Sequence, residues 1–176
     1  MSINIKMCGC CPYNNQAKYN VTLSKNIQYI WNKKNKGPLC IEDNNSDILL
    51  VFEAPGIDEW SKNKPIISNQ RGSAARKLKV AMLVAGKKRE AYDITEAVRC
   101  FPGTSKGERN RKILKEIDAA ANFCIGYLEL DILSKEYRKI ICFGSVAYNS
   151  VMKIYSKLKN THSQFNTSYA QSKFDK

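Results

Sequence analysis

The fold is decided by residues 47–59, which read Asp47-Ile-Leu-Leu-Val-Phe-Glu-Ala-Pro-Gly-Ile-Asp-Glu59. Their first half, residues 48–52, is a continuous apolar run with turn-forming residues on both sides. Such a run is typical of a strand that is buried on both faces of a parallel sheet. Three carboxylates, Glu53, Asp58 and Glu59, follow the run, and open α/β sheets bind their ligands beside the carboxyl ends of the strands. The spacing is equally compatible with a solvated acidic loop.

The composition is ordinary for a folded protein except in its charge. The chain has 176 residues, with 29 basic against 16 acidic side chains and a net charge of +13, which favours nucleic acid or another anionic partner. No apolar run approaches the ~20 residues of a membrane span, and the N-terminus lacks the apolar core of a signal peptide. We therefore expect a single domain over residues 1–176, monomeric and cytoplasmic. In a reducing compartment, its seven cysteines predict a metal or iron–sulfur site rather than disulfides.

Helical and extended patterns are both present along the chain. Segments 90–100 and 138–144 read as strands, the second of them buried, and segment 60–72 reads as a long loop. Amphipathic helices are expected over residues 22–36, 73–87, 111–133 and 145–157. The apolar side is Ala74, Leu78, Ala81 and Leu83 in the 73–87 helix, and Ile113, Ile117, Ala121, Cys124, Leu128 and Ile132 in the 111–133 helix.

Two motifs resemble the family 4 branch of the uracil-DNA glycosylase superfamily. Val51-Phe-Glu-Ala-Pro-Gly-Ile-Asp-Glu59 is similar to its first motif, which reads roughly G-E-A-P-G-x-x-E, and Cys8-Gly-Cys-Cys-Pro12 is similar to its C-x-x-C-P opening. The resemblance implies a three-layer α/β/α sandwich with a mostly parallel, four-stranded central sheet. It also implies that Glu53 and Glu59 are catalytic, and that Ala54, Pro55 and Gly56 contact the substrate.

The resemblance extends to the cysteines. It implies a [4Fe–4S] cluster held by Cys8, Cys11, Cys100 and Cys124, since four thiolates hold such a cluster. Cys10 is a possible replacement for Cys8 or Cys11. A zinc site with four cysteine ligands and four unrelated buried cysteines are the alternatives. Cys40 and Cys142 are interpreted as packing residues.

Two positions depart from the family pattern where it reads the base. Ile66 stands in place of a stacking Phe, and Glu96 stands in place of an Asn that reads uracil. A carboxylate accepts a hydrogen bond from the cytosine amine, so a modified cytosine or another amino-bearing base is a possible substrate beside uracil. In the tail, His162 and Ser163 resemble the second catalytic motif, H-P-S, which implies a catalytic His162 and a substrate-binding Ser163.

The basic side chains gather in two segments that we expect at the strand ends. Lys62, Lys64 and Arg71 belong to the first, and Arg99, Lys106, Arg109 and Arg111 to the second, where they would contact DNA phosphates. The function implied is hydrolysis of the N-glycosidic bond of a base flipped out of single- or double-stranded DNA. The alternative is a catalytically idle iron–sulfur protein that binds DNA with the same fold.

Overall fold

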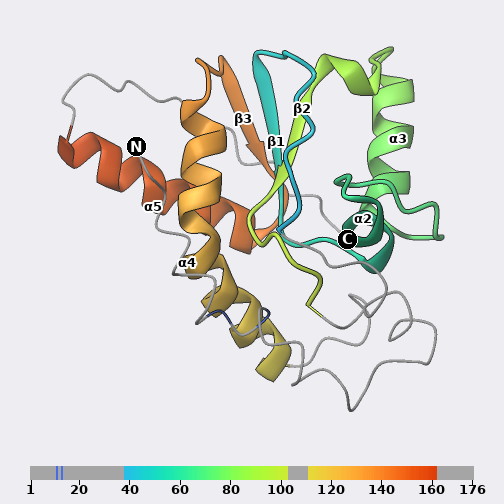
Figure 1. Cartoon of the computed structure of the whole chain (residues 1–176). Helices are drawn as coiled ribbons and strands as arrows, with labels where there is room; N and C mark the ends of the chain where they lie inside the picture. The colour runs from blue at the N-terminus through green and yellow to red at the C-terminus, as the bar shows by residue number, and fades with distance from the viewer. Residues whose placement is uncertain (1–10, 12, 14–37, 103–110, 162–176) are drawn as a thin grey trace.

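The computed structural model describes residues 11, 13, 38–102 and 111–161 (Figure 1). The predicted 22–36 helix and the tail lie outside this part of the chain. Within it, strands and helices alternate, as the sequence predicts. The elements are β1 (Ile48–Phe52), α2 (Ile57–Lys62), α3 (Ala74–Val84), the 3-10 helix η3 (Arg89–Ala91), β2 (Asp93–Glu96), α4 (Arg111–Leu133), β3 (Lys139–Cys142) and α5 (Ser145–Thr161).

The three described strands form one parallel sheet in the order β2-β1-β3. Leu50 of β1 is in register with Ile94 of β2 on one side and with Ile141 of β3 on the other. Outside β2, Glu42 forms an antiparallel bridge with Ile94, through backbone hydrogen bonds of 2.9 and 3.0 Å. The free edge of β2 is therefore partly covered. Among the described strands β3 pairs with β1 alone, and it is half-buried, so the prediction of a buried strand there was wrong.

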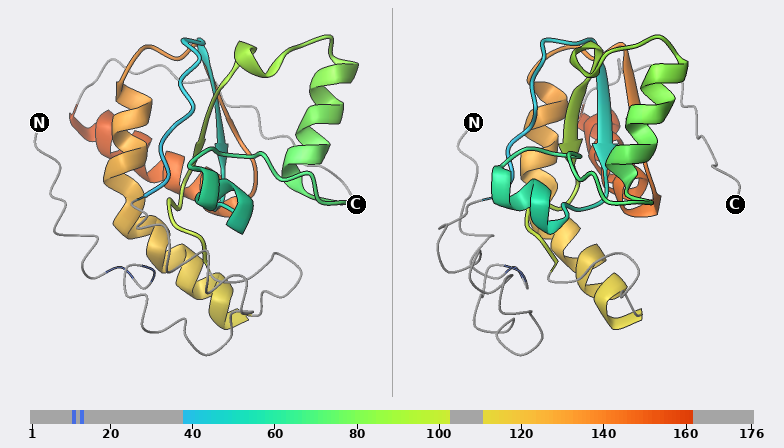
Figure 2. Two further views of the ribbon diagram at one scale, coloured as in Figure 1. Left: turned by 45° about the vertical axis from the view of Figure 1, so that its right-hand side comes forward. Right: turned by 90° about the vertical axis from the view of Figure 1, so that its right-hand side faces the viewer.

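Side chains alternate across β1 into two apolar clusters, one on each face of the sheet. Leu49 and Val51 belong to the larger cluster, which includes the buried sides of α4 and α5. Leu50 and Phe52 belong to the smaller one, which Met82 of α3 completes. Figure 2 shows α3 on one side of the strands, with α4 and α5 on the other. The continuous apolar run is thus explained by burial from both sides.

The two strands that follow β1 in the sequence lie on opposite sides of it in the sheet. The connection through α3 leads to β2 on one side of β1, and the connection through α4 leads from β2 to β3 on the other side. The strand order therefore reverses at β1, and its carboxyl end is a topological switch point, where open α/β sheets form a crevice for ligands. No helix in the described residues is both long and apolar enough to span a bilayer.

Most predicted elements are confirmed, but three details were wrong. Helix 111–133 has the predicted bounds, and its apolar positions from Ile117 to Ile132 are buried. The predicted loop 60–72 begins inside α2, whose first turn contains Asp58 and Glu59, the charge that a helix N-terminus favours. The strand predicted over 90–100 has only four residues in the sheet. In α3, Ala75, Leu78 and Met82 face the core, whereas Ala74, Ala81 and Leu83 are exposed.

Candidate functional site

Glu53 occupies the switch point, because it is the first residue after β1. Its carbonyl oxygen accepts a hydrogen bond from the backbone N–H of Val98 at 3.0 Å, which ties the ends of β1 and β2 together. Its carboxylate reaches the opposite way, toward β3, where Oε2 lies 3.6 Å from the position that a Cβ would take on Gly144. The half-buried carboxylate of Glu53 is therefore held at the meeting point of all three described strands.

Gly144 makes room for this carboxylate. It follows β3 with a φ of +97°, a conformation that other L-residues rarely adopt. Any side chain at this position would be strained and would also contact Glu53. The end of β3 therefore requires glycine both for its backbone turn and for the approach of the carboxylate.

Glu59 lies in α2 and is buried, so the alternative of a solvated acid is wrong for this residue. Its Oε1 accepts hydrogen bonds from the backbone N–H groups of Ile67 at 3.0 Å and Ser68 at 2.7 Å. Its Oε2 lies so close to Gly56 that a Cβ there would approach it to 2.5 Å. Gly56 thus lets the carboxylate fold back beneath the strand end. These contacts give Glu59 the geometry of a residue that positions the 65–68 loop.

Arg89 holds the same loop from its other side, a role that the sequence analysis missed. Its Nη1 donates to the carbonyl of Ile66 at 2.8 Å, and its Nη2 donates to the carbonyl of Pro65 at 2.5 Å. The guanidinium also forms a two-pronged ion pair with Glu42, at 2.8 and 2.6 Å. Burial raises the pKa of Glu42, but the interactions with Arg89, Lys64 and Asn44 together outweigh this effect, and the net shift is downward. Arg89 follows two lysines in the sequence, and nothing in such a basic stretch distinguishes the one residue that binds and fixes the loop.

Ile66 has a strained backbone, with a φ of +50°. A β-branched residue in this region is a real outlier, and such strain persists only where surrounding contacts enforce it. Here Arg89 fixes the carbonyl, while the side chain is buried against Phe52, Met82 and Ile94. Because that side chain faces the core, a substrate in this structure would meet the backbone of the loop rather than the Ile66 side chain.

Glu96 ends β2 in register with Phe52 and is fully buried. It stands two residues after Ile94 and therefore on the same sheet face, the face that Ile66 covers. The two positions predicted to read a base thus belong to one side of the sheet, next to the switch point.

The turn after β2 is bound to α4 by a buried polar network. Arg99 donates to Asp131 of α4 and to the carbonyl of Leu39, the latter at 2.8 Å. Thr95 donates to the same Asp131 carboxylate at 2.6 Å. Burial raises the pKa of Asp131, against the opposing effect of the Arg99 guanidinium. This network places the chain around Cys100 beside α4.

The described cysteines divide into two groups. Cys11 and Cys124 are buried in the larger apolar cluster, and Cys100 packs against it, so three of the four predicted cluster ligands share one region. Within the described residues, however, no three His, Cys, Asp or Glu side chains are grouped as a metal ion would require. Cys142 packs as predicted, and burial raises its pKa to about 11. Cys40 is exposed, so its interpretation as a packing residue was wrong.

The predicted DNA contacts are described in part. Arg99 is buried in the network with Asp131, so its prediction as a DNA contact was wrong. Lys62 at the end of α2 is exposed, as are Lys64 and Arg71 between α2 and α3, and Lys64 forms an ion pair with Glu42 at 3.4 Å. The side chain of Arg111 is not described. Outside the described residues lie Cys8, Cys10, Lys106, Arg109, His162 and Ser163.

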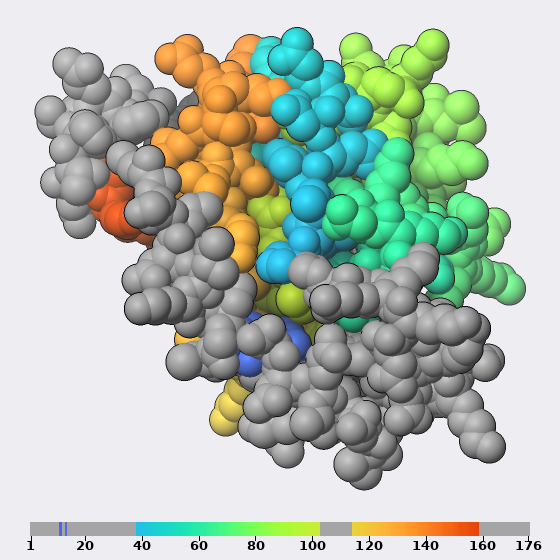
Figure 3. Space-filling model, viewed as in Figure 1, coloured from blue at the N-terminus to red at the C-terminus, as the bar shows by residue number. Residues whose placement is uncertain are grey.

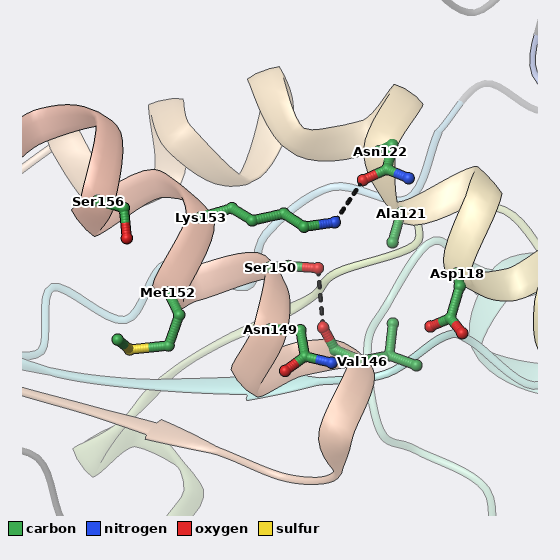
Figure 4. A pocket seen from close by; sticks show the side chains of 9 residues that line it. All are labelled: Asp118, Ala121, Asn122, Val146, Asn149, Ser150, Met152, Lys153 and Ser156. Atoms are coloured by element: carbon green, nitrogen blue, oxygen red, sulfur yellow. Dashed lines mark hydrogen bonds between the residues drawn. The ribbon is translucent and has the colours of Figure 1, made fainter.

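A separate groove runs between α4 and α5, with a volume of about 530 Å³ (Figure 4). Two of its polar side chains have hydrogen-bond partners within the groove: Lys153 donates to Asn122 at 2.7 Å, and Ser150 donates to the backbone carbonyl of Val146 at 2.8 Å. No residue that the sequence analysis selected as a site residue lines this groove. The candidate site is therefore the switch point.

Comparison with known proteins adds no assignment. No family model matches the chain, and a search of curated proteins finds no significant match.

Proposed function

We propose that this chain is a DNA glycosylase, which hydrolyses the N-glycosidic bond of a uracil or modified base flipped out of DNA. The observation that carries the proposal is the position of Glu53. Its carboxylate stands at the switch point of a parallel sheet, where such folds bind their ligands, in the residues that resemble the family's first motif. With this function we also propose the complete fold of the family, a three-layer sandwich with a fourth strand in the central sheet.

The chemistry needs a carboxylate of this kind. Breaking an N-glycosidic bond develops positive charge on the sugar and negative charge on the departing base. Glu53 would stabilise the sugar cation and orient the attacking water, as carboxylates do in glycosidic hydrolysis. A hydrogen-bond donor stabilises the departing base, and we assign this part to His162, with Ser163 beside it.

The 65–68 loop would form one wall of the base pocket. Glu59 and Arg89 hold it from opposite sides, and Ile66 keeps a strained backbone within it. Strain that the surroundings enforce is most often found at binding sites, so it supports a working role for this loop. We assign Glu59 to the catalytic machinery as the residue that fixes the loop. Ala54, Pro55 and Gly56 would line the pocket from the β1 side.

DNA would approach from the side of the strand ends. Lys62 and Arg71 present exposed cations there, and we add Lys64, Arg109 and Arg111 to the phosphate-binding set. Phosphate contacts supply affinity without reading sequence, which suits an enzyme that searches DNA for a single altered base. Flipping the base is what brings it within reach of Glu53.

A [4Fe–4S] cluster on Cys8, Cys11, Cys100 and Cys124 completes the proposal. It is supported by the shared location of Cys11, Cys100 and Cys124 and by the donor chemistry of four thiolates. Its role would be structural, because it would tie the N-terminal residues to the turn after β2 and to α4. Anaerobically purified protein is expected to be brown, with about four irons per chain, and Cys124→Ala is expected to bleach it. Colourless protein with one zinc would contradict the cluster.

The deciding experiment is base excision. Purified protein is incubated with oligonucleotides that carry uracil, 5-substituted cytosines or other modified bases, and abasic sites are scored after cleavage. Glu53→Gln is expected to lower single-turnover excision about 10²–10⁴-fold, because it removes the charge but keeps the shape. Glu90→Gln is the matched control, since Glu90 is an exposed acid within η3.

DNA binding is measured on the same variants. Unchanged affinity with lost excision would place Glu53 in the chemical step. Equal excision by wild type and Glu53→Gln would refute the assignment of Glu53. Salt-dependent DNA binding with no excision of any base in the panel would favour the idle iron–sulfur protein.

A further inference from the structure

α3 presents apolar side chains to solvent. Val80 is 55% exposed, Leu83 79% and Val84 83%, the three highest values among the exposed large apolar residues of the described chain. We call these three residues the outer stripe. They stand at i, i+3 and i+4, the spacing that gathers side chains on one side of a helix.

The outer stripe is not the edge of the core side. Ala75, Leu78 and Met82 pack against the sheet. At about 100° of rotation per residue, the outer stripe falls on nearly the opposite side of the helix. The space-filling view shows α3 at the surface, on the opposite side of the molecule from α5 (Figure 3). α3 therefore has two apolar sides, one buried against the sheet and the other exposed to solvent.

The charged residues of α3 and of the chain on either side of it are basic from Lys62 to Arg89. Lys77 and Lys79 flank it on α3, and Lys87 and Lys88 follow the helix. From Trp60 to Arg89 the sequence contains no aspartate or glutamate, and its nine basic residues are Lys62, Lys64, Arg71, Arg76, Lys77, Lys79, Lys87, Lys88 and Arg89. A partner with apolar and acidic side chains would complement this surface in both respects.

We propose that the outer stripe docks an acidic amphipathic helix of a partner protein. Helices commonly bind such surfaces through apolar residues at i, i+3, i+4 and i+7, and glutamates beside those residues would meet the flanking lysines. The docked helix would cover Val80, Leu83 and Val84 and leave the core side of α3 unchanged.

Other occupants fit the chemistry less well. Residues 1–37 contain no acid and residues 162–176 contain only Asp175, so the ends of the chain bring no complementary charge. A second copy of the chain would bring the lysines that flank one outer stripe against those that flank the other, and like charges repel. DNA would attract the lysines but make no use of the apolar side chains. Helices that lie on membranes usually insert Trp, Phe or Leu, whereas this stripe has one Leu and two Val.

The location keeps the surface apart from the candidate active site. α3 leads from the carboxyl end of β1 to the start of β2, so its last turn lies at the end of the sheet where β2 begins (Figure 1). Leu83 and Val84 belong to that turn. A docked helix would therefore leave the switch point open, and the protein could be recruited by its partner while it holds DNA. The inference does not depend on which reaction the switch point performs.

The test uses a displayed library of 20-residue helix-forming peptides. Apolar positions are drawn from Leu, Ile, Val and Phe, and flanking positions from Glu, Lys and Gln in equal proportion. Selection on the full chain is expected to enrich Glu at the flanking positions. Enriched peptides are expected to bind Leu83→Ser/Val84→Ser at least about tenfold more weakly, because buried apolar anchors dominate such interfaces. Leu130→Ser/Leu133→Ser is the matched control, since both of its leucines are exposed on α4.

A charge exchange separates this proposal from general stickiness. Lys77→Glu/Lys79→Glu is expected to shift the enrichment from Glu toward Lys. Enrichment of Lys or Gln on the wild type would overturn the proposal, and so would peptides that bind the stripe variant as tightly as the wild type. Stripe-dependent binding to phosphatidylserine vesicles, or stripe-dependent dimers in sedimentation, without acidic peptide binding, would assign the surface to a membrane or to a second copy instead.

Discussion

The two ends of the sheet hold their carboxylates in different ways. Where the strands begin, the acids meet cations: Asp47 pairs with Arg138 at 2.6 Å, and Asp43 and Asp93 share Lys135 at 2.7 and 2.8 Å. Where the strands end, Glu59 is bound by backbone N–H groups, and no cation pairs with it among the described residues. The acids where the strands begin are thus held by ion pairs between side chains, whereas Glu59 is held by hydrogen bonds from the backbone.

This difference separates what folds the chain from what it does. Where the strands begin, ion pairs between side chains join segments that are far apart in sequence. At the other end Glu53 is placed beside a glycine, and a loop is held by Glu59 and Arg89. We therefore expect substitutions at the first end to change stability, and substitutions at the second end to change activity.

The strongest test of the comparison is Asp93→Asn. Asp93 is fully buried and accepts from the backbone N–H groups of Asn44 and Ser46 at 2.8 and 3.0 Å, and from Tyr137 at 2.8 Å. The new amide would turn a donor toward Tyr137 and Lys135, which are themselves donors. We expect a loss of about 2–4 kcal/mol in the free energy of unfolding, measured by urea titration.

Asp43→Asn is the control for this loss. It removes a carboxylate that also binds Lys135 but is exposed, and such changes usually stay within about 0.5 kcal/mol. Under conditions where the variant is folded and the enzyme saturates the DNA substrate, the excision rate of Asp93→Asn should match that of the wild type. A fall in excision without a fall in stability would show that the two ends are not separate in function.

The sequence predicts the framework better than the site because the two depend on different information. The strand β1 and the helix α4 follow from continuous or periodic apolar residues, which need no knowledge of distant contacts. α2 was missed because six residues are too few to show a period. The clamp by Arg89 was missed because it depends on carbonyls more than 20 residues away.

The face of α3 shows a second reason. Both of its sides are apolar, so periodicity alone cannot say which one meets the sheet. The structure buries Met82 and exposes Leu83, a choice that follows from the position of the sheet. A prediction from the helix alone therefore takes residues from both sides. Likewise, Cys40 stands between the packed residues Leu39 and Ile41, but its own side chain is exposed.

Glu96→Asn sharpens the comparison at the functional end. If Glu96 reads the base, its carboxylate repels uracil O4 and accepts from an exocyclic amine. The wild type is then poor on uracil, and the variant gains uracil excision about tenfold to hundredfold, the discrimination expected for one buried hydrogen bond. Rates on uracil, cytosine and 5-substituted cytosines are compared for both proteins. Efficient uracil removal by the wild type, unchanged in the variant, would show that Glu96 points away from the base.

A smaller effect is expected from the exposed cations. Lys62→Glu/Arg71→Glu is expected to weaken DNA binding several-fold for all sequences alike, and to reduce the slope of affinity against salt concentration by roughly two phosphate contacts. Lys139→Glu is the control, since Lys139 is exposed at the start of β3, on the opposite end of the sheet. An equal loss for Lys139→Glu would mean that net charge, rather than the strand-end surface, attracts DNA.

The smallest expected effect is a change of stability with pH, and it comes from the ion pair between Glu42 and Arg89. The pKa of Glu42 is lowered from its ordinary value of 4.5, because the interactions with Arg89, Lys64 and Asn44 together outweigh the effect of burial. A lowered pKa means that the ionised pair stabilises the fold above about pH 4.5, and that this contribution is lost as the pH falls through the lower, folded-state value. Because the pair remains partly open to solvent, we expect it to contribute about 1 kcal/mol to the free energy of unfolding at neutral pH.

Urea titrations of wild type and Glu42→Gln between pH 7 and pH 3 would measure it. The wild type should be more stable at pH 7, and the difference should shrink on acidification because the variant has no proton to gain at this position. Moderate salt should leave most of the difference in place, since Glu42 is shielded. Asp47→Asn removes a fully exposed pair with Arg138, so any difference that it causes should disappear in salt. If Glu42 behaved in the same way, Arg89 would not be a fixed clamp, and the 65–68 loop would owe its conformation to Glu59 alone.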